Sequence, residues 1–149
     1  MTETHTLKAF RAKFRVDELK VLENPSWTWS VRPGQATLGA GILSLNRHAA
    51  TFSEVTEDEM IDLAGLVTTL EGAVRVAFDH RIMNYLMLMM VDHHVHYHVI
   101  PRYEGTRKFA GRDWVDNGWP GLPVLADSQY ADEPALLRKI QELLKSQLG

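Results

Sequence analysis

The segment His94-Val95-His96-Tyr97-His98-Val99-Ile100, followed by Pro101 and Arg102, decides how this sequence is interpreted. Its three histidines alternate with apolar residues, and alternate residues of an extended strand point to the same face. The spacing therefore predicts a strand that carries a row of three imidazoles, with neighbours roughly 6.5–7 Å apart along the strand. The apolar residues between the histidines then point to the opposite face, into a core.

Two features upstream of this strand predict its immediate neighbours. Residues 82–91 form an almost continuous apolar run, which is typical of a strand buried on both faces. Only Asp92-His93 would separate this run from the histidine strand, so we expect an antiparallel hairpin with a short connection. Thr56-Glu57-Asp58-Glu59 matches a capping box, and apolar residues then recur at three- and four-residue steps. This pattern predicts a helix over about residues 57–78 that packs on one face of a sheet.

The remaining segments complete the predicted fold. Further strands are expected over residues 14–22, 27–31 and 37–45, and a last helix is expected to begin at Asp132 or Glu133. Residues 1–11 suggest a weakly ordered start. We therefore predict an α+β fold with a five-stranded antiparallel sheet, one main helix on the sheet and a C-terminal helix. The expected organisation is a single domain over 1–149, with a core over about 12–103 and a loop-rich extension plus the last helix over 104–149.

Composition narrows the classes of protein and partner. The chain has 149 residues and no cysteine, so it has no disulfides and no thiolate metal site, which fits a reducing compartment. The net charge is −3 without a Lys/Arg cluster, which argues against binding to duplex nucleic acid. No apolar run approaches the roughly 18–20 residues of a membrane span, and the N-terminus lacks the apolar region of a secretory signal. We expect a cytoplasmic protein without a membrane partner.

The histidine row is suited to chemistry at phosphorus. Close imidazoles disfavour simultaneous protonation, so a neutral member can stand beside a charged one near neutral pH. The neutral ring can attack phosphorus and form a covalent adduct, while a protonated ring donates to an oxygen or to the leaving group. His96 has a histidine on either side, so we predict His96 as the nucleophile, helped by His94 and His98.

Two other interpretations of the row remain open. Alternating histidines on a strand can bind zinc or copper, with His93 as a fourth imidazole and Asp92 as a carboxylate ligand. A purely structural role for the histidines is the other. We favour phosphorus chemistry over both and expect neither a metal nor a cofactor.

The histidine segment with its Pro101-Arg102 continuation resembles the motif of the histidine triad family. The predicted order of strands, capped helix and hairpin agrees with that family over about residues 12–103. The terminal helix is most similar to the branch that contains the fragile histidine triad protein. This resemblance implies a homodimer with one continuous sheet. It also implies hydrolysis or transfer of nucleotidyl groups from dinucleoside polyphosphates, nucleoside phosphoramidates or related adenylates.

The resemblance also implies roles for single residues. His96 matches the nucleophile that carries a transient nucleotidyl group, His98 the residue that contacts the α-phosphate, and His94 a supporting residue. The chain departs from the family pattern at three places. Gly39-Ala40 replaces a Gly-His pair, Arg32 replaces a ribose-binding Asn, and a Gly-Gln loop before the triad is missing.

These departures predict a reshaped pocket. Its candidate substrate-binding residues, besides His98, are Arg32, Asn46 and His48, with Arg47 beside them. A base could stack on Trp27 or Trp29, although strand aromatics more often belong to a core. The alternative function is a non-catalytic nucleotide-binding or scaffold homodimer.

Overall fold

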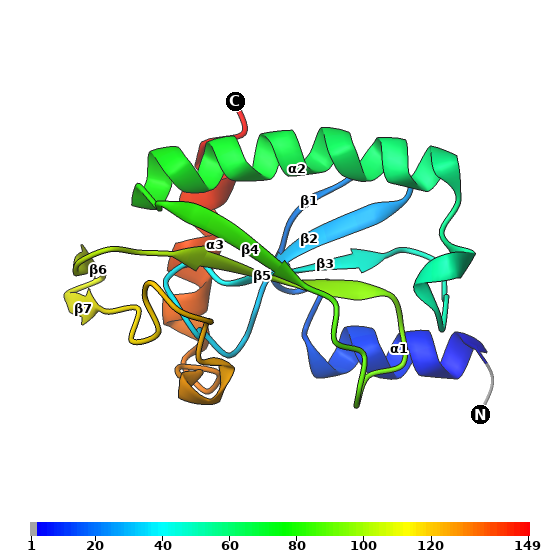
Figure 1. The fold of residues 1–149 in the computed structure, drawn as a ribbon, viewed down its shortest axis with the longest axis horizontal. Helices are drawn as coiled ribbons and strands as arrows, with labels where there is room; N and C mark the ends of the chain where they lie inside the picture. Colours follow the sequence, from blue (N-terminus) through cyan, green and yellow to red (C-terminus); the bar gives the residue numbers. More distant parts are fainter. Residues whose placement is uncertain (1–2) are drawn as a thin grey trace.

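Five antiparallel strands form the central sheet of the structure, a computed structural model that describes residues 3–149 (Figure 1). In spatial order they are β1 (Lys20–Glu23), β2 (Trp27–Val31), β3 (Gly41–Leu45), β5 (His96–Arg102) and β4 (Ile82–Leu86). The histidine strand β5 therefore lies between β3 and β4, and His98 faces Ile42 on one side and Leu86 on the other. The predicted α+β class with a five-stranded antiparallel sheet is confirmed.

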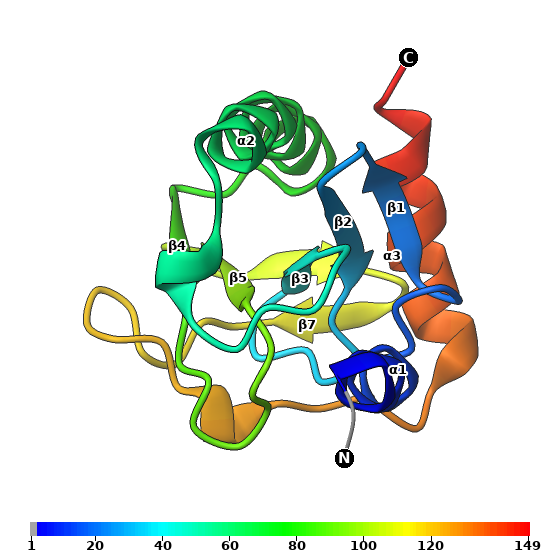
Figure 2. The ribbon, with the colours of Figure 1, turned by 90° about the vertical axis from the view of Figure 1, so that its right-hand side faces the viewer.

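Two helices cover opposite faces of this sheet. Helix α2 (Glu57–Phe78) lies along one face, and α1 (Glu3–Lys13) lies on the other (Figure 2). The capping box at the start of α2 is present as predicted, since the Thr56 hydroxyl accepts from the Glu59 amide and the Glu59 carboxylate accepts from the Thr56 amide. Helix α3 (Pro134–Ser146) packs against β1, β2 and α2 at one edge.

The main hydrophobic core lies between α2, α3 and the sheet. It includes Val95 and Val99, with Tyr97 packed against it, so the residues between the histidines point into the core as predicted. Trp27 and Trp29 are also fully buried in this core, and the Trp27 indole donates to the Glu59 carbonyl across 2.8 Å. Both tryptophans therefore belong to the core on the α2 side, which excludes the expectation that they stack a base.

The prediction for the N-terminus is wrong where it can be checked. Residues 3–11 form most of α1, and residues 1–2 lie outside the described part of the chain. Phe10 of α1 and Phe14, the residue after α1, form a second, smaller apolar cluster with Val16 and Ile42. Burial of those two aromatic rings against the sheet stabilises the helix. Charged residues lie between them in the sequence, so the apolar face of the helix is not obvious there.

The hairpin prediction needs a correction as well. Strand β4 ends at Leu86, and residues 87–95 form a long loop rather than a strand with a short connection. Met90 and Val91 are 82% and 75% exposed, so this part of the apolar run is not buried on two faces. The backbone of Met89 has a φ of 53°, which ends the extended conformation.

Two other predicted strands are shorter than expected. The 14–22 segment becomes a strand only at Lys20. The 37–45 segment becomes one only at Gly41, because Gly39 turns the chain with a φ of 84°.

The extension after β5 contains a small hairpin and a backbone contact that joins it to the loop after β2. Strands β6 (Arg107–Phe109) and β7 (Arg112–Trp114) pair with each other, and a short 3-10 helix spans Leu125–Asp127. A second short 3-10 helix, Phe52–Glu54, lies outside the extension, just before α2. The Gln35 and Gln129 backbones exchange hydrogen bonds, which holds the segment around residue 128 beside the loop after β2. No helix within residues 3–149 is long and apolar enough to cross a membrane.

Candidate active site

His94 is anchored by backbone groups on both sides of its ring. Its Nε2 lies 2.8 Å from the Leu45 carbonyl, and its Nδ1 accepts from the Ala49 amide across 3.4 Å. A carbonyl can only accept, so the proton of the neutral ring resides on Nε2. Burial lowers the pKa of His94 to about 4. His94 precedes β5 and is a neutral ring that ties the strand to the end of β3.

His96 is held by one nitrogen only. Its Nδ1 donates to the main-chain carbonyl of His94 across 2.5 Å, which leaves Nε2 unprotonated. Nε2 is buried and has no hydrogen-bond partner among the described residues. Burial lowers the pKa of His96, so the ring is neutral at pH 7. The result is a fixed imidazole whose Nε2 lone pair is not used by any group of the described residues.

His98 is oriented by a cation. The Arg32 Nε donates to His98 Nδ1 across 3.2 Å, so the neutral His98 ring carries its proton on Nε2. Burial and the adjacent Arg32 charge lower the pKa of His98 to about 4. Its ring meets that of His96 edge to face, with centroids 4.9 Å apart. His98 is therefore a hydrogen-bond donor whose ring contacts the ring of His96.

Arg32 is held by neutral partners. Its Nη1 donates to the Gly34 carbonyl at 2.6 Å and to the Ser128 hydroxyl at 2.7 Å. No carboxylate within residues 3–149 forms an ion pair with it. The guanidinium therefore keeps an uncompensated positive charge next to the triad.

A cleft of about 340 Å³ opens beside these groups. His96, His98 and Arg32 line it together with Lys13 and Asp92, whose side chains form an ion pair of 2.8 Å. Apolar walls complete it: Phe14, Leu88, Met89, Met90, Val91 and Leu125. The cleft thus combines two imidazoles, two cations and one carboxylate, which is paired with Lys13, with walls that can cover an apolar group.

Helix α1 and Phe14, the residue that follows it, cover the histidine rings on one face of the sheet. The Phe10 ring centroid lies 5.0 Å from that of His94 and 4.7 Å from that of His96, and Phe14 lies 5.9 Å from His96 and 6.1 Å from His98. All three imidazoles therefore face the same side of the sheet, as the alternation predicts. Phe10, Phe14 and Lys13 are site residues that the sequence analysis missed. The spacing of Leu7, Phe10 and Phe14 was the signal for an apolar helix face.

Two predicted substrate-binding residues lie outside the cleft. Asn46 accepts from the Thr28 hydroxyl at 2.6 Å and donates to the Asn24 carbonyl at 2.9 Å, so it fastens the β2–β3 end of the sheet. His48 stacks on His94 at 5.4 Å, away from His98. Their neighbour Arg47 pairs with Glu59 at the start of α2. The structure brings Arg32 into the cleft beside His98, whereas His48 contacts the triad only at His94, outside the cleft, and Asn46 and Arg47 have their partners elsewhere.

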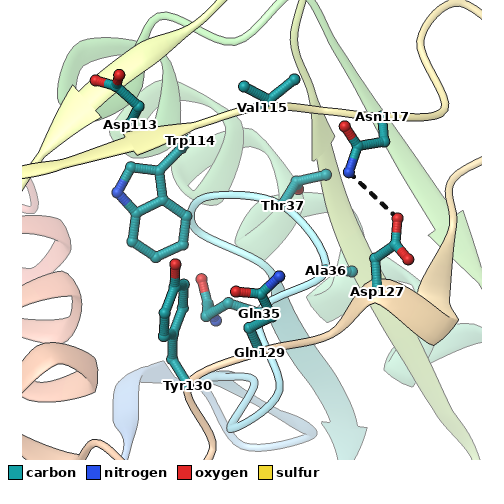
Figure 3. Close-up of a pocket in the computed structure, with 10 residues that line it drawn as sticks. All are labelled: Gln35, Ala36, Thr37, Asp113, Trp114, Val115, Asn117, Asp127, Gln129 and Tyr130. Carbon is teal, nitrogen blue, oxygen red and sulfur yellow. Dashed lines mark hydrogen bonds between the residues drawn. The ribbon is translucent and has the colours of Figure 1, made fainter.

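A second cavity of about 240 Å³ lies away from the histidines, between the 35–37 loop and the extension (Figure 3). Trp114 and Tyr130 form one wall, and Asn117 donates to Asp127 across 3.3 Å on the other side. The Gln35 side chain also lines this cavity, but its amide nitrogen donates to the carbonyls of residues 32 and 40, and its oxygen accepts from the amide of residue 39. Within the described part of the chain, no three His, Asp or Glu side chains are arranged to hold a metal ion.

Sequence comparisons and structural comparisons give different results. No protein-family model and no curated protein match this sequence. Solved structures do match the fold. A hypothetical histidine triad nucleotide-binding protein from Sulfolobus tokodaii aligns with a TM-score of 0.69 at 18% identity, covering 97% of this chain and 91% of that chain.

Further structural neighbours carry similar descriptions. A Hit-like protein involved in cell-cycle regulation from Bartonella henselae aligns with a TM-score of 0.65 at 14% identity, covering 93% of this chain and 95% of that one. A zinc-bound histidine triad family protein from Mycobacterium smegmatis aligns with a TM-score of 0.58 at 17% identity, covering 93% and 95%. The chain therefore has the fold of histidine triad proteins.

Proposed function

We propose that this protein is a histidine triad nucleotide hydrolase or nucleotidyl transferase, with His96 as its nucleophile. The observation that carries the proposal is the state of His96: Nδ1 is fixed by the His94 carbonyl, and Nε2 is deprotonated and unpartnered. A neutral imidazole in this state is a competent nucleophile toward phosphorus. The histidine triad fold and the cationic cleft support a phosphate ester or anhydride as the electrophile.

The first step would proceed as follows. The lone pair of His96 Nε2 attacks the α-phosphorus, an N–P bond forms, and the bond from phosphorus to the leaving group breaks. The His94 carbonyl, which accepts from Nδ1, stabilises the positive charge that develops on the His96 ring. In the second step water attacks phosphorus, the N–P electron pair returns to Nε2, and the water proton passes to solvent. The intermediate is a nucleotidyl-histidine.

The tautomer of His98 favours one kind of leaving group. With Nδ1 occupied by Arg32, His98 can donate its Nε2–H to a phosphate oxygen but is not positioned to act as an imidazolium acid. A leaving group that must be protonated is therefore disfavoured. A phosphate chain leaves as a stable anion, so we infer that phosphoanhydrides such as dinucleoside polyphosphates are better substrates than phosphoramidates.

Access to His96 requires a movement. Phe10 and Phe14 lie against the His96 ring, and Nε2 is buried. While α1 keeps this position, a phosphorus atom cannot reach Nε2 for an in-line displacement. Catalysis then needs a shift of α1 or of its two phenylalanines. The same burial favours the alternative, a non-catalytic nucleotide-binding or scaffold protein. In that case the cover over His96, formed by α1 with Phe10 and Phe14, stays closed.

We also propose that the protein acts as a homodimer in the cytoplasm. Strand β4 is an edge strand, and Ile82 on it is 54% exposed. An unprotected edge of this kind can pair with a second copy. Light scattering coupled to size-exclusion chromatography tests this: a mass of one chain would contradict it.

The catalytic proposal is tested with diadenosine triphosphate, adenosine 5′-phosphoramidate and AMP. We expect the wild-type protein to hydrolyse the anhydride faster than the phosphoramidate, and His96→Ala to lose turnover while it still binds AMP in calorimetry. Mass spectrometry of acid-sensitive adducts should find one AMP moiety on His96 in the wild-type chain. Turnover that survives in His96→Ala would overturn the proposal. AMP binding without hydrolysis of any substrate would favour the non-catalytic alternative.

A further inference from the structure

The strongest observation that the reaction scheme does not use is the ion pair between Lys13 and Asp92. Lys13 is the last residue of α1, and Asp92 lies in the loop before β5. The ammonium contacts both carboxylate oxygens, at 2.8 and 2.9 Å, and both residues line the cleft with His96 and His98. The Lys13 side chain remains 51% exposed, so its stem can move without unfolding α1.

We propose that Lys13 is a substrate-binding residue that exchanges Asp92 for the phosphate chain of the incoming substrate. This inference rests on the proposed function and adds a residue and a charge requirement to it. The phosphates of a chain that extends beyond the α-phosphate carry negative charge that the neutral His98 ring cannot balance. Arg32 stands beside His98 without a carboxylate partner, and Lys13 supplies a second cation on the α1 side of the cleft.

The exchange is reasonable on electrostatic grounds. Asp92 offers one negative charge to Lys13, whereas a di- or triphosphate offers several in the same cleft. Burial is the main cause of the lowered pKa values of His96 and His98; the charges of Arg32 and Lys13 lower these pKa values further, and the charge of Asp92 raises them, so all three charged groups act on the histidines that would contact phosphate. When Lys13 leaves Asp92, the only described ion pair between α1 and the 87–95 loop is broken. Binding of the phosphate chain would therefore loosen the cover over His96.

Opposite effects of two substitutions distinguish this role from a structural one. Lys13→Gln removes the cation, and Asp92→Asn removes its competitor. If Lys13 binds phosphate, Lys13→Gln weakens binding of inorganic tripolyphosphate about tenfold, because hydrogen bonds to charged groups contribute on that order. Asp92→Asn instead tightens binding, by about threefold. If the ion pair only fastens α1, both substitutions break the same contact and shift binding in the same direction.

The measurement is calorimetric titration of tripolyphosphate into the full-length protein, with AMP titrated in parallel. Lys13→Arg should restore binding to within about threefold of wild type, since it keeps the charge. The matched control is the exposed pair Lys108–Asp113, also 2.8 Å apart and away from the cleft. Lys108→Gln and Asp113→Asn should leave tripolyphosphate binding unchanged.

The outcomes separate the two proposals. Wild-type binding of tripolyphosphate and AMP with no change in Lys13→Gln, or with changes of equal sign in Lys13→Gln and Asp92→Asn, overturns the role of Lys13 alone. Absence of binding of both ligands to the wild-type protein overturns the proposed function together with it. Thermal denaturation of each variant confirms that the folded protein is being titrated.

Discussion

Arg32 donates its Nε–H to Nδ1 of His98 across 3.2 Å, and this contact decides which proton His98 can offer. The guanidinium cannot act as an acceptor, so His98 must present its lone pair to Arg32 and its N–H to the cleft. The same contact brings a positive charge beside the ring and, after burial, is the next largest reason for its low pKa.

Replacing Arg32 with Gln should therefore raise the pKa of His98 above its present value of about 4. Loss of the adjacent charge favours the imidazolium form, although burial still disfavours it. We expect kcat/KM for an anhydride substrate to fall at least tenfold, because a phosphate contact and the orientation of His98 are lost together. An NMR titration of the His98 ring measures the pKa. An unchanged His98 titration in Arg32→Gln would show that the contact is not formed in solution.

The cover formed by Phe10 predicts how accessible His96 is. Phe10→Leu shortens the side chain that lies 4.7 Å from the His96 ring. We expect faster modification of His96 by diethyl pyrocarbonate and a higher kcat/KM, at a cost of about 1–2 kcal/mol in stability. Peptide mass spectrometry quantifies the modification.

Phe78→Leu is the matched control for that experiment. Phe78 is as deeply buried as Phe10 but lies in the α2-side core, against Phe109. It should lose a similar amount of stability while His96 stays protected. Equal exposure of His96 in both variants would mean that general loosening, not the α1 cover, controls access.

The buried histidines predict a loss of stability in acid. His94 and His98 have folded-state pKa values of about 4, below the ordinary value of 6.5. The unfolded chain therefore binds more protons between these pH values, and the free energy of unfolding decreases as the pH falls. The stabilisation is fully present above about pH 6.5 and is lost by about pH 4. Its upper limit is roughly 3 kcal/mol for each histidine.

Urea unfolding at pH 7 and pH 4.5 measures this dependence. His98→Gln should reduce the difference between the two pH values, because one of the buried imidazoles no longer takes up a proton on unfolding. His93→Gln removes an exposed histidine of the 87–95 loop, just before β5, and should leave the difference as in wild type. A pH dependence that His98→Gln does not alter would contradict the burial of a neutral His98.

The ion pair Arg102–Asp116 should be the strongest single anchor of the extension. Its atoms are 2.7 Å apart, the two side chains are only 4% and 2% exposed, and Asp116 also accepts from the Tyr103 amide. Asp116→Ala leaves a buried guanidinium without its counter-charge, which costs about 3–5 kcal/mol. Asp113→Ala, in an exposed ion pair, should cost less than about 1 kcal/mol. Equilibrium unfolding of the two variants compares them directly.

Local patterns in the sequence were sufficient for much of the architecture. The capping box at Thr56–Glu59 and the helical period predict α2 over the residues that form it, and Trp27–Val31 alternates as the strand that it becomes. The histidine alternation places all three rings on one side of the sheet. These features depend on periodicity and capping, which are properties of neighbouring residues, so the sequence alone carries them.

Other features depend on contacts between distant segments. The apolar residues of 88–91 resemble part of a strand, but they line a cleft, and apolar character does not distinguish these two environments. Asn46 and Arg32 are both polar residues at strand ends. Asn46 fastens the β2–β3 end of the sheet, and Arg32 donates to His98. The tertiary fold selects these partners, so the sequence does not distinguish the two roles.

The sequence by itself determined the sheet, the long capped helix and the common face of the three imidazoles, because each follows from short-range spacing. Only the tertiary structure decided that α1 covers that face, that Arg32 sets the proton of His98, and that Lys13 meets Asp92 at the cleft. These contacts join residues far apart in the chain, 79 positions in the case of Lys13 and Asp92, and their geometry is fixed by packing of the whole chain rather than by any local pattern.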